Sequence, residues 1–305
     1  MFTKPINPNI INRLFIYSIV AIAFFIAATT HASPEEQSLT THGNTPITKD
    51  AFEWQFMLDM ALVNSPVMLT DVEQTELWDY VQLGLLFDIS YKGFFLRTNS
   101  RRSSTILGGE ELGYQITVQK DWQLDVILKA YIEGFDPIEI LDDQNKDIPE
   151  LVGLNNREYT SGIALRYSRY FENAIFYIDI ASARASENEQ GHSATGIIID
   201  SFYSYLIPYR NWDIYLGAGL TYYEKALMDY YIGINADEVS SARPFHIADS
   251  TFRAQLEVYA QYPLSQSWSF NAGITQSFYS NSIKRSPIID KNKLTQLMVG
   301  VLYVF

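Results

Sequence analysis

Apolar side chains occupy alternate positions over most of the chain, in segments of roughly 10 residues. From Phe52 to Met60, for example, large apolar side chains alternate with Glu53, Gln55 and Asp59. Successive side chains of a β-strand point to opposite faces, so each segment is a predicted strand with one apolar and one polar face. The shortest segment has the weakest pattern. Twelve strands are predicted, at residues 52–60, 81–89, 93–98, 112–119, 122–132, 158–169, 173–185, 194–206, 212–223, 251–262, 267–279 and 293–305.

The connections between these segments alternate in length. The short ones read SYK, KD, FEN, PYRN and PLSQS, and the long ones span 63–77, 99–109, 134–157, 186–193, 224–250 and 280–292. Short turns at one end and long loops at the other are typical of an outer-membrane barrel, whose closed sheet exposes no edge to lipid. The expected fold class is therefore all-β: a transmembrane antiparallel up-and-down β-barrel of about 12 strands, with short periplasmic turns and long extracellular loops. Alternation alone would suit a soluble sandwich equally well.

Aromatic residues favour the barrel over the sandwich. Trp122, Trp212 and Trp268 each begin a strand just after a short turn, at the level where aromatic side chains form the interfacial girdle of a bilayer protein. The final segment, LTQLMVGVLYVF, alternates up to Tyr303 and Phe305. Lipid accommodates the apolar face of such a last strand. Its aromatic end is the predicted recognition signal for the barrel assembly machinery, read by strand addition.

The first 32 residues have the layout of a secretory signal peptide. Lys4 and Arg13 precede an apolar run at 14–28, and Ala32 supplies a small residue before the cut. A transmembrane anchor is the alternative, but about 15 residues fall short of the roughly 20 that a span requires. No later run is long enough either, so a helical membrane protein is excluded. The predicted parts are a cleaved signal peptide at 1–32, a periplasmic N-terminal segment at 33–50 and an outer-membrane β-barrel at 51–305.

Composition and charge exclude several classes of site and partner for this protein. The chain has no cysteine, which excludes disulfides and thiolate metal sites. Its formal net charge is −13, and removal of Lys4 and Arg13 with the signal peptide makes it more negative. A nucleic-acid partner is excluded, because a phosphate backbone requires a basic face. The 21 tyrosines and 18 phenylalanines argue against disorder. We expect an exported protein in the outer membrane of a Gram-negative bacterium.

The strand register places a set of charged side chains on the face opposite the lipid, toward the lumen. One interpretation is a hydrated polar filling held by ion pairs. The other is a narrow channel whose acidic excess prefers cations. The predicted lumen charges are Glu53, Asp59, Asp125, Lys129, Arg166, Asp179, Asp200, Asp213, Arg253 and Glu257.

Basic residues cluster near two predicted strand ends. Arginine binds phosphate oxygens through paired N–H groups, so these clusters are predicted to contact lipopolysaccharide phosphates at the outer rim. Ordinary surface charge is the alternative interpretation. The predicted contacts are Arg97, Arg101, Arg102, Lys284 and Arg285.

A catalytic site is not expected. The stretch GHSATG at 191–196 is superficially similar to a nucleophile elbow, but its fifth position is Thr195 rather than glycine. His192 and Ser193 are sequence neighbours, which face opposite ways on a strand and form no catalytic pair there. His42, His192 and His246 lack the spacing of zinc ligands. We therefore expect no enzyme activity, no cofactor and no metal; a lipid hydrolase using Ser193 or His192 is the alternative.

Three stretches carry a family resemblance. Residues 151–167 read LVGLNNREYTSGIALRY, residues 229–250 read DYYIGINADEVSSARPFHIADS and residues 286–305 read SPIIDKNKLTQLMVGVLYVF. In order and spacing they resemble the MltA-interacting protein (MipA)/OmpV family of outer-membrane proteins. That family has a Leu-x-Gly-Leu segment before an arginine, a Tyr-Tyr-x-Gly-Val segment before a glutamate, and a Ser-Pro-hydrophobic ending with an aromatic stop. Near the start, NSPVMLTDVEQTELW replaces the family's Tyr-x-Gly-Ser and proline-rich stretch.

The resemblance implies a scaffold. The family's namesake bridges a lytic murein transglycosylase and a bifunctional murein synthase at the outer membrane, and other members are surface antigens or adhesins. Because the periplasmic turns are short, partner contacts are expected in residues 33–50 and at Tyr209, Arg210 and Asn211 in one turn. Outer-membrane lipid and lipopolysaccharide are the other expected partners. A cation-preferring channel and a surface antigen or adhesin are the alternatives.

Overall fold

The computed structural model describes residues 52–74, 77–98 and 110–305. All of them belong to a unit that runs from His42 to Phe305. The predicted signal peptide, the predicted periplasmic segment at 33–50, and Arg101 and Arg102 lie outside the described residues.

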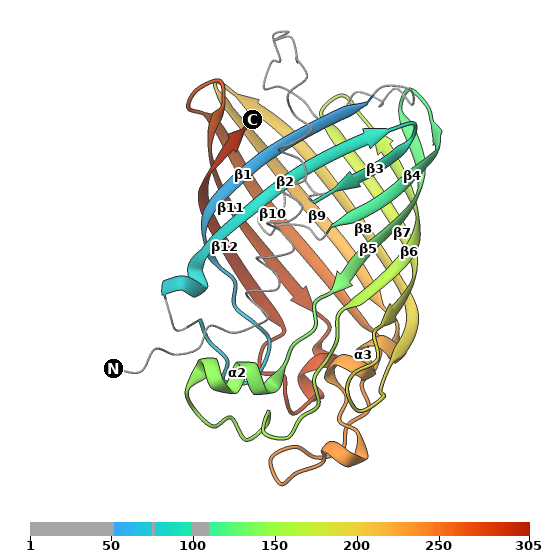
Figure 1. Cartoon of the computed structure of the whole chain (residues 1–305), viewed down its shortest axis with the longest axis vertical. Coiled ribbons are helices and arrows are strands. Elements are labelled where there is room, and N and C mark those ends of the chain that lie inside the picture. Colours follow the sequence, from blue (N-terminus) through green and yellow to red (C-terminus); the bar gives the residue numbers. More distant parts are fainter. Residues whose placement is uncertain (1–51, 75–76, 99–109) are drawn as a thin grey trace, which may run out of the picture. The chain divides into compact units, whose positions relative to one another are not determined.

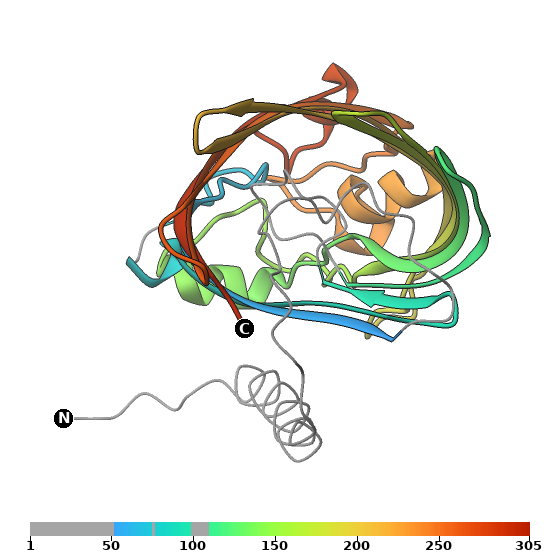
Figure 2. The same cartoon turned by 90° about the horizontal axis from the view of Figure 1, so that it is seen from above.

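Twelve antiparallel strands form one closed sheet (Figures 1 and 2). Each strand pairs with its neighbours in sequence, and β1 pairs with β12, from Met57 opposite Val304 to Asn64 opposite Leu297, to close the ring. The predicted up-and-down barrel is confirmed. The strands are β1 Glu53–Asn64, β2 Val81–Tyr91, β3 Phe94–Arg97, β4 Glu111–Val118, β5 Trp122–Ile132, β6 Thr160–Tyr170, β7 Ala174–Ala185, β8 Ala194–Tyr209, β9 Trp212–Tyr223, β10 Thr251–Pro263, β11 Trp268–Tyr279 and β12 Lys293–Val304.

Short and long connections alternate around the barrel as predicted. The weak segment at 93–98 forms β3, which is only four residues long. Its inward Phe95 is buried against Gly113 on β4, where a Cβ atom would collide with the ring. Glycine at 113 is therefore required by this close approach between the two strands.

Side chains alternate between the lumen and the outer surface. On β7, Asp179, Ala181 and Ala183 are buried toward the lumen, whereas Ile180 between them is 56% exposed on the outside. Water would penalise an apolar face of this extent, and lipid does not. The alternation that identified the strands is thus the alternation between lipid and a polar interior.

Aromatic side chains form a belt on the outer surface near the short turns. Trp122, Trp212 and Trp268 each lie beside a tyrosine; the ring centroids are 5.0 Å apart for Trp212 and Tyr262, and 4.9 Å apart for Trp268 and Tyr303. Amphipathic rings at one level are typical of a membrane interface.

Short helices form in the long loops. α2 (Pro137–Gln144) begins after Asp136, whose carboxylate accepts a hydrogen bond of 2.8 Å from the backbone N–H of Ile138. Proline fits the first helical position because that position needs no N–H donor, and Asn145 ends the helix with a φ of 50°. α3 (Lys225–Ile232) packs on β8. The single-turn helices are η1 Leu77–Tyr80, η2 Ala236–Glu238 and η3 Asn281–Arg285. In the described part of the chain, no helix has the length and apolar character to cross a membrane.

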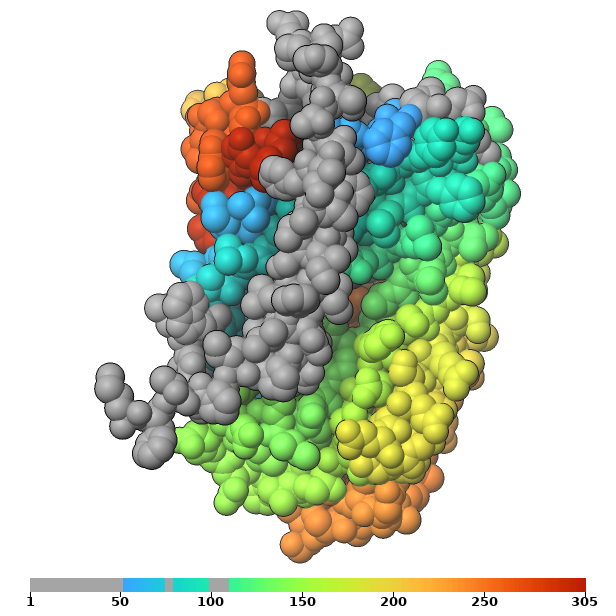
Figure 3. All heavy atoms as spheres, in the orientation of Figure 1, coloured from blue at the N-terminus to red at the C-terminus, as the bar shows by residue number. Residues whose placement is uncertain are grey.

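The long loops fold together into a cap at one end of the barrel, made of residues 65–74, 133–159, 224–250 and 280–292 (Figure 1). In Figure 3 the green and orange loops, residues 133–159 and 224–250, form the lower end. Its interior is apolar: Leu151, Leu227, Ile283 and Ile288 are fully buried in one cluster that continues into the barrel wall. Isolated β-bridges tie the loops together, at Leu69–Ile289, Phe135–Arg157 and Ile234–His246. The cap is therefore a folded element whose apolar core is shared with the barrel wall.

Candidate functional site

A chain of ion pairs runs along one wall of the lumen, centred on Arg166 of β6. Its guanidinium donates to both carboxylate oxygens of Asp179, at 2.7 and 2.9 Å, and to both oxygens of Glu111, at 3.0 and 2.9 Å. All three side chains are buried. Bidentate Arg–carboxylate pairs of this kind are the strongest of the charge-assisted hydrogen bonds.

The chain continues from Asp179 to neighbouring strands. The Nζ atom of Lys129 lies 2.7 Å from Asp179 and 3.4 Å from Asp200. Thr221 donates to Asp200 at 2.8 Å, and Arg253 donates to Thr221 at 3.1 Å. These bonds link β5, β7, β8, β9 and β10 across one wall of the lumen.

Arg97 belongs to the same network, which corrects the expectation that it lies at the outer rim. Its side chain is 3.2 Å from Asp88 and 3.9 Å from Glu111. Arg97 and Phe95 are two residues apart on β3, so both face the lumen, while Phe94 and Leu96 face outward. The sequence shows a basic cluster, but the strand register decides whether a residue on the strand faces the lumen or the outer surface.

The other predicted lumen charges bond to neutral groups. Asn271 donates to Asp59 at 3.1 Å, Gln123 donates to Asp125 at 2.7 Å, and Glu257 accepts from Gln255 at 3.2 Å and Thr275 at 3.3 Å. Glu53 is exposed and Asp213 half-buried near the turn end. The structure thus brings together Arg97, Lys129, Arg166, Asp179 and Asp200, and reaches Arg253 through Thr221. It leaves Asp59, Glu53 and Asp213 outside that network.

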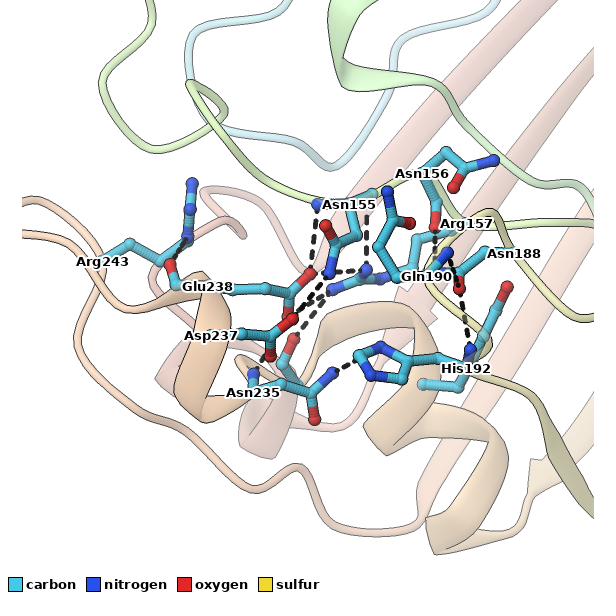
Figure 4. A network of polar contacts seen from close by, with 12 residues as sticks. Asn155, Asn156, Arg157, Asn188, Gln190, His192, Asn235, Asp237, Glu238 and Arg243 are labelled. Atoms are coloured by element: carbon cyan, nitrogen blue, oxygen red, sulfur yellow. Dashed lines mark hydrogen bonds and ion pairs between the residues drawn. The ribbon is translucent and has the colours of Figure 1, made fainter.

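A second buried ion pair joins the two largest loops of the cap (Figure 4). Arg157 donates to both carboxylate oxygens of Glu238, at 2.8 and 3.1 Å, and to the carbonyl oxygens of Asn155 and Gly233. Glu238 also accepts from the backbone N–H of Asn155, at 3.1 Å, and of Asn235, at 2.9 Å. Each side chain of the pair is only 1% exposed. We call this pair the cap clamp.

Electrostatics favour the charged form of Glu238. Burial alone would raise the pKa of Glu238, but the hydrogen bonds from Arg157 and from the backbone of Asn235 outweigh it, so the pKa lies below its ordinary value. Arg243 lies on the other side of the loop and donates to the carbonyl oxygens of Glu238, Glu150 and Val152, at 2.8, 2.7 and 3.2 Å.

Tyrosines and a histidine complete the contacts between loops. Tyr231 donates to the carbonyl oxygen of Glu158, at 2.6 Å, and its hydroxyl lies 2.6 Å from that of Thr160; burial raises the pKa of Tyr231. The imidazole of His192 lies 3.4 Å from the amide nitrogen of Asn235 (Figure 4). His192 is therefore part of the packing between the loops. Among the described residues, no three His, Cys, Asp or Glu side chains gather as a metal site would require.

The cap clamp was not predicted, although its residues lie in two of the stretches that carry the family resemblance. The sequence shows Arg157 and Glu238 as two charged residues among many in loops that mix polar and apolar positions, with nothing local that pairs them. Their pairing depends on a contact between residues 81 positions apart, which no local pattern specifies.

The remaining predicted contacts lie on exposed surfaces. Arg285 pairs with Asp249 at 2.9 Å, with both side chains more than half exposed, and Lys284 precedes it in η3. Contact of this pair with lipopolysaccharide stays a prediction. At the opposite end, the ring of Tyr303 lies 4.9 Å from that of Phe305, whose N–H donates to the carbonyl oxygen of Phe56 at 3.1 Å.

A protein-family model described as MltA-interacting protein MipA matches residues 72–305. This match covers well over half of the chain. The chain belongs to the MipA family. The resemblance predicted from three stretches is confirmed, and both halves of the cap clamp fall within the matched residues of this MipA family member. The match begins at Val72, so β1 and residues 33–50 lie outside it.

Three solved outer-membrane proteins show low similarity to the chain. The NanC porin is 9% identical, with 81% of this chain and 98% of that chain covered and a TM-score of 0.40. A loop-deletion mutant of OmpT, an outer-membrane protein of Vibrio cholerae, is 6% identical, with 85% and 100% covered and a TM-score of 0.40. The outer-membrane channel DcaP of Acinetobacter baumannii is 7% identical, with 83% and 96% covered and a TM-score of 0.39. No curated protein matches the chain. The fold assignment rests on the strand pairing itself.

Proposed function

We propose that this protein is a non-catalytic scaffold of the outer membrane, which holds a murein transglycosylase of the MltA kind, and with it a murein synthase, at the periplasmic end of the barrel. The observation that carries the proposal is membership of a family named for its interaction with MltA. The paired charges of the lumen and of the cap support a structural role for these side chains, because breaking a buried ion pair is strongly destabilising.

The β8–β9 hairpin is the part of the turn end best suited to a protein partner. β7 pairs with β8 only up to Ala174 opposite Tyr205, so β8 continues four residues beyond it to Tyr209. The guanidinium of Arg210 lies 5.3 Å from the ring centroid of Tyr209, and that tyrosine is 55% exposed. Exposed tyrosine and arginine are enriched among residues that dominate binding energies. Pro208 has no N–H on the open edge, which disfavours strand addition and leaves side-chain contact.

Co-purification tests the scaffold. The tagged mature protein, extracted from its own envelope in mild detergent, is expected to enrich a murein transglycosylase and a murein synthase. Replacing both Tyr209→Ser and Arg210→Glu should reduce this enrichment about tenfold, as loss of a binding hot spot does. Deletion of residues 33–50 tests the other predicted contact.

The matched control is the β6–β7 turn, with Phe171→Ser and Glu172→Lys, at the same end of the barrel. Equal losses in both turn variants would show that the β8–β9 hairpin has no special role. A preparation that carries lipopolysaccharide and no murein enzyme would refute the scaffold.

The last residue provides an independent test of the assembly signal. We expect Phe305→Ser to lower the amount of barrel in the outer membrane severalfold, while the purified variant refolds in detergent at the wild-type rate. The reason is that Phe305 is 66% exposed and adds little to the fold, whereas the assembly machinery is proposed to read it. Heat-modifiability on gels measures the amount of folded barrel, both in outer-membrane fractions and over time during refolding of the purified variant. Slow refolding of the purified variant would instead assign Phe305 a structural role.

A further inference from the structure

A second pair of buried polar side chains lies in the lumen, outside the ion pairs around Arg166. Asp59 of β1 and Asn271 of β11 are each 2% exposed, and the amide of Asn271 donates to Oδ1 of Asp59 at 3.1 Å. Both strands pair with β12, on which Asp59 lies opposite Leu302 and Asn271 lies opposite Gly300. The two side chains therefore meet across one strand on the inner face of the barrel.

Each member of this pair keeps one buried oxygen atom without a hydrogen-bond donor. These atoms are Oδ2 of Asp59 and Oδ1 of Asn271. Both belong to one site, because a single hydrogen bond of 3.1 Å joins the side chains that carry them. The same bond fixes the orientation of the amide, since only its NH₂ group can donate to a carboxylate. The site thus presents two oxygen acceptors, one from a carboxylate and one from an amide.

The charge of Asp59 is poorly compensated by the protein. On the wall around Arg166, Glu111, Asp179 and Asp200 each have an arginine or lysine nitrogen within 3.4 Å. Asp59 accepts one hydrogen bond from a neutral amide, and it has no ion-pair partner in the described ranges 52–74, 77–98 and 110–305. A buried carboxylate is unfavourable unless a counter-charge accompanies it, so the site calls for a cation.

Apolar side chains border the site on one side. Tyr259 of β10 hydrogen-bonds to Asn271 and also packs in a small apolar cluster with Ala61, Val63 and Met298. Beside such a cluster the dielectric constant is lower than in water, which strengthens the attraction between a carboxylate and a cation. The surroundings therefore favour an ion held at this position over one spread through the lumen.

We propose that Asp59 and Asn271 bind one alkali cation, sodium or potassium, through Oδ2 of Asp59 and Oδ1 of Asn271. Carboxylate and carbonyl oxygens are the ligands of hard cations, and membrane proteins hold sodium and potassium with oxygen ligands that carry little charge. Calcium fits less well, because it takes about 6–8 oxygen ligands, and no three His, Cys, Asp or Glu side chains gather among the described residues. The proposal is independent of the scaffold function, which concerns the turn end of the barrel.

Sodium-23 NMR on the whole mature barrel, folded in detergent micelles, tests this site. Sodium that exchanges with a protein site gives a broadened line, and we expect potassium to reverse the broadening at constant ionic strength while the much larger choline does not. Asp59→Asn keeps the shape of the side chain and removes its charge, so it should weaken sodium binding at least about tenfold. Thermal unfolding provides a second readout: with sodium about tenfold above its Kd, the ratio of folded to unfolded wild-type protein should be about tenfold higher than in choline.

Glu257→Gln is the matched control. Glu257 is 3% exposed in the same lumen but already accepts hydrogen bonds from Gln255 and Thr275, so its replacement should change sodium binding less than about twofold. Equal weakening by the two variants would overturn the proposal, because it describes diffuse attraction to an acidic lumen. Wild-type barrel that gives no potassium-reversible broadening would also overturn it, and would assign a proton or water to Asp59. Displacement of sodium by calcium at far lower concentration would refute the assignment to an alkali ion. Heat-modifiability confirms that both variants are folded.

Discussion

Replacing Arg166 by methionine is expected to destabilise the barrel more than any other single substitution in the lumen. Methionine fills a similar volume but pairs with no carboxylate. Asp179 would keep Lys129 at 2.7 Å, whereas Glu111, whose side chain is fully buried, would keep Arg97 alone, at 3.9 Å, among the ion-pair partners in the part of the chain that the structure describes. Removing one partner of a buried ion pair costs about 3–5 kcal/mol, because the other charge stays in a low-dielectric site. Guanidinium unfolding of the refolded barrel in vesicles measures the loss.

A second substitution tests whether the carboxylate of Glu111, left without Arg166, is the cause of the lost stability. Adding Glu111→Gln to Arg166→Met should restore a substantial part of the lost stability, since a neutral amide is far less costly to bury than a carboxylate. Arg169→Met on the same strand is the control: its partner Asp121 is at 2.7 Å, but both side chains are more than a third exposed, so about 0–1 kcal/mol is expected. Equal effects at 166 and 169 would show that the lumen is as well solvated as the rim.

The barrel was predictable from sequence because one local rule governs every strand. A residue that faces lipid must be apolar and its neighbours face the lumen, so alternation reports both the strand and its register. The register inferred for Asp125, Arg166, Asp179 and Glu257 agrees with their burial in the structure. Even the four-residue β3 left a recognisable signal at 93–98.

The cap was not predictable by the same reasoning. Its order comes from contacts between loops, whose apolar residues, among them Leu151, Leu227 and Ile288, are buried in one cluster, and such contacts have no period along the sequence. Asp136 and Pro137 do form a recognisable helix start. That signal predicts α2 but not what α2 packs against. The family resemblance pointed to the right stretches without giving their geometry.

Arg97 shows how a correct local signal can mislead. Three arginines within six positions read as a basic surface cluster near a strand end. Because β3 stops at Arg97, that residue is the last to follow the strand register, which turns it toward Asp88 and Glu111. The boundary of a strand, which is the least certain part of a sequence-based prediction, decided the role of the side chain.

Replacing Arg157 by methionine is expected to open the cap while leaving the barrel closed. Glu238 would stay buried with only backbone donors, from Asn155 and Asn235. The expected loss of stability is again about 3–5 kcal/mol. It destabilises the cap locally, because the β-bridges Phe135–Arg157 and Ile234–His246 form only while the two loops are joined. Hydrogen exchange read by mass spectrometry should show faster exchange in residues 133–159 and 224–250, with the strands unchanged.

Acid should also break the Arg157–Glu238 ion pair of the cap clamp in the wild-type protein, by protonating Glu238. Because the pKa of Glu238 is lowered in the folded state, its stabilisation is complete above the ordinary pKa of glutamate, about 4.3, and is lost as the pH falls through the lower folded value. The loss therefore begins as the pH falls below about 4.3 and is complete only below the lower folded pKa, where the wild-type cap should exchange as the Arg157→Met variant does at neutral pH. Adding Glu238→Gln to Arg157→Met should restore protection in part, and Arg285→Met, which breaks an exposed pair with Asp249, should leave exchange unchanged. If Arg157→Met instead accelerated exchange across all strands together, cap and barrel would form one cooperative unit, and the clamp would stabilise the whole fold rather than the closure of one end.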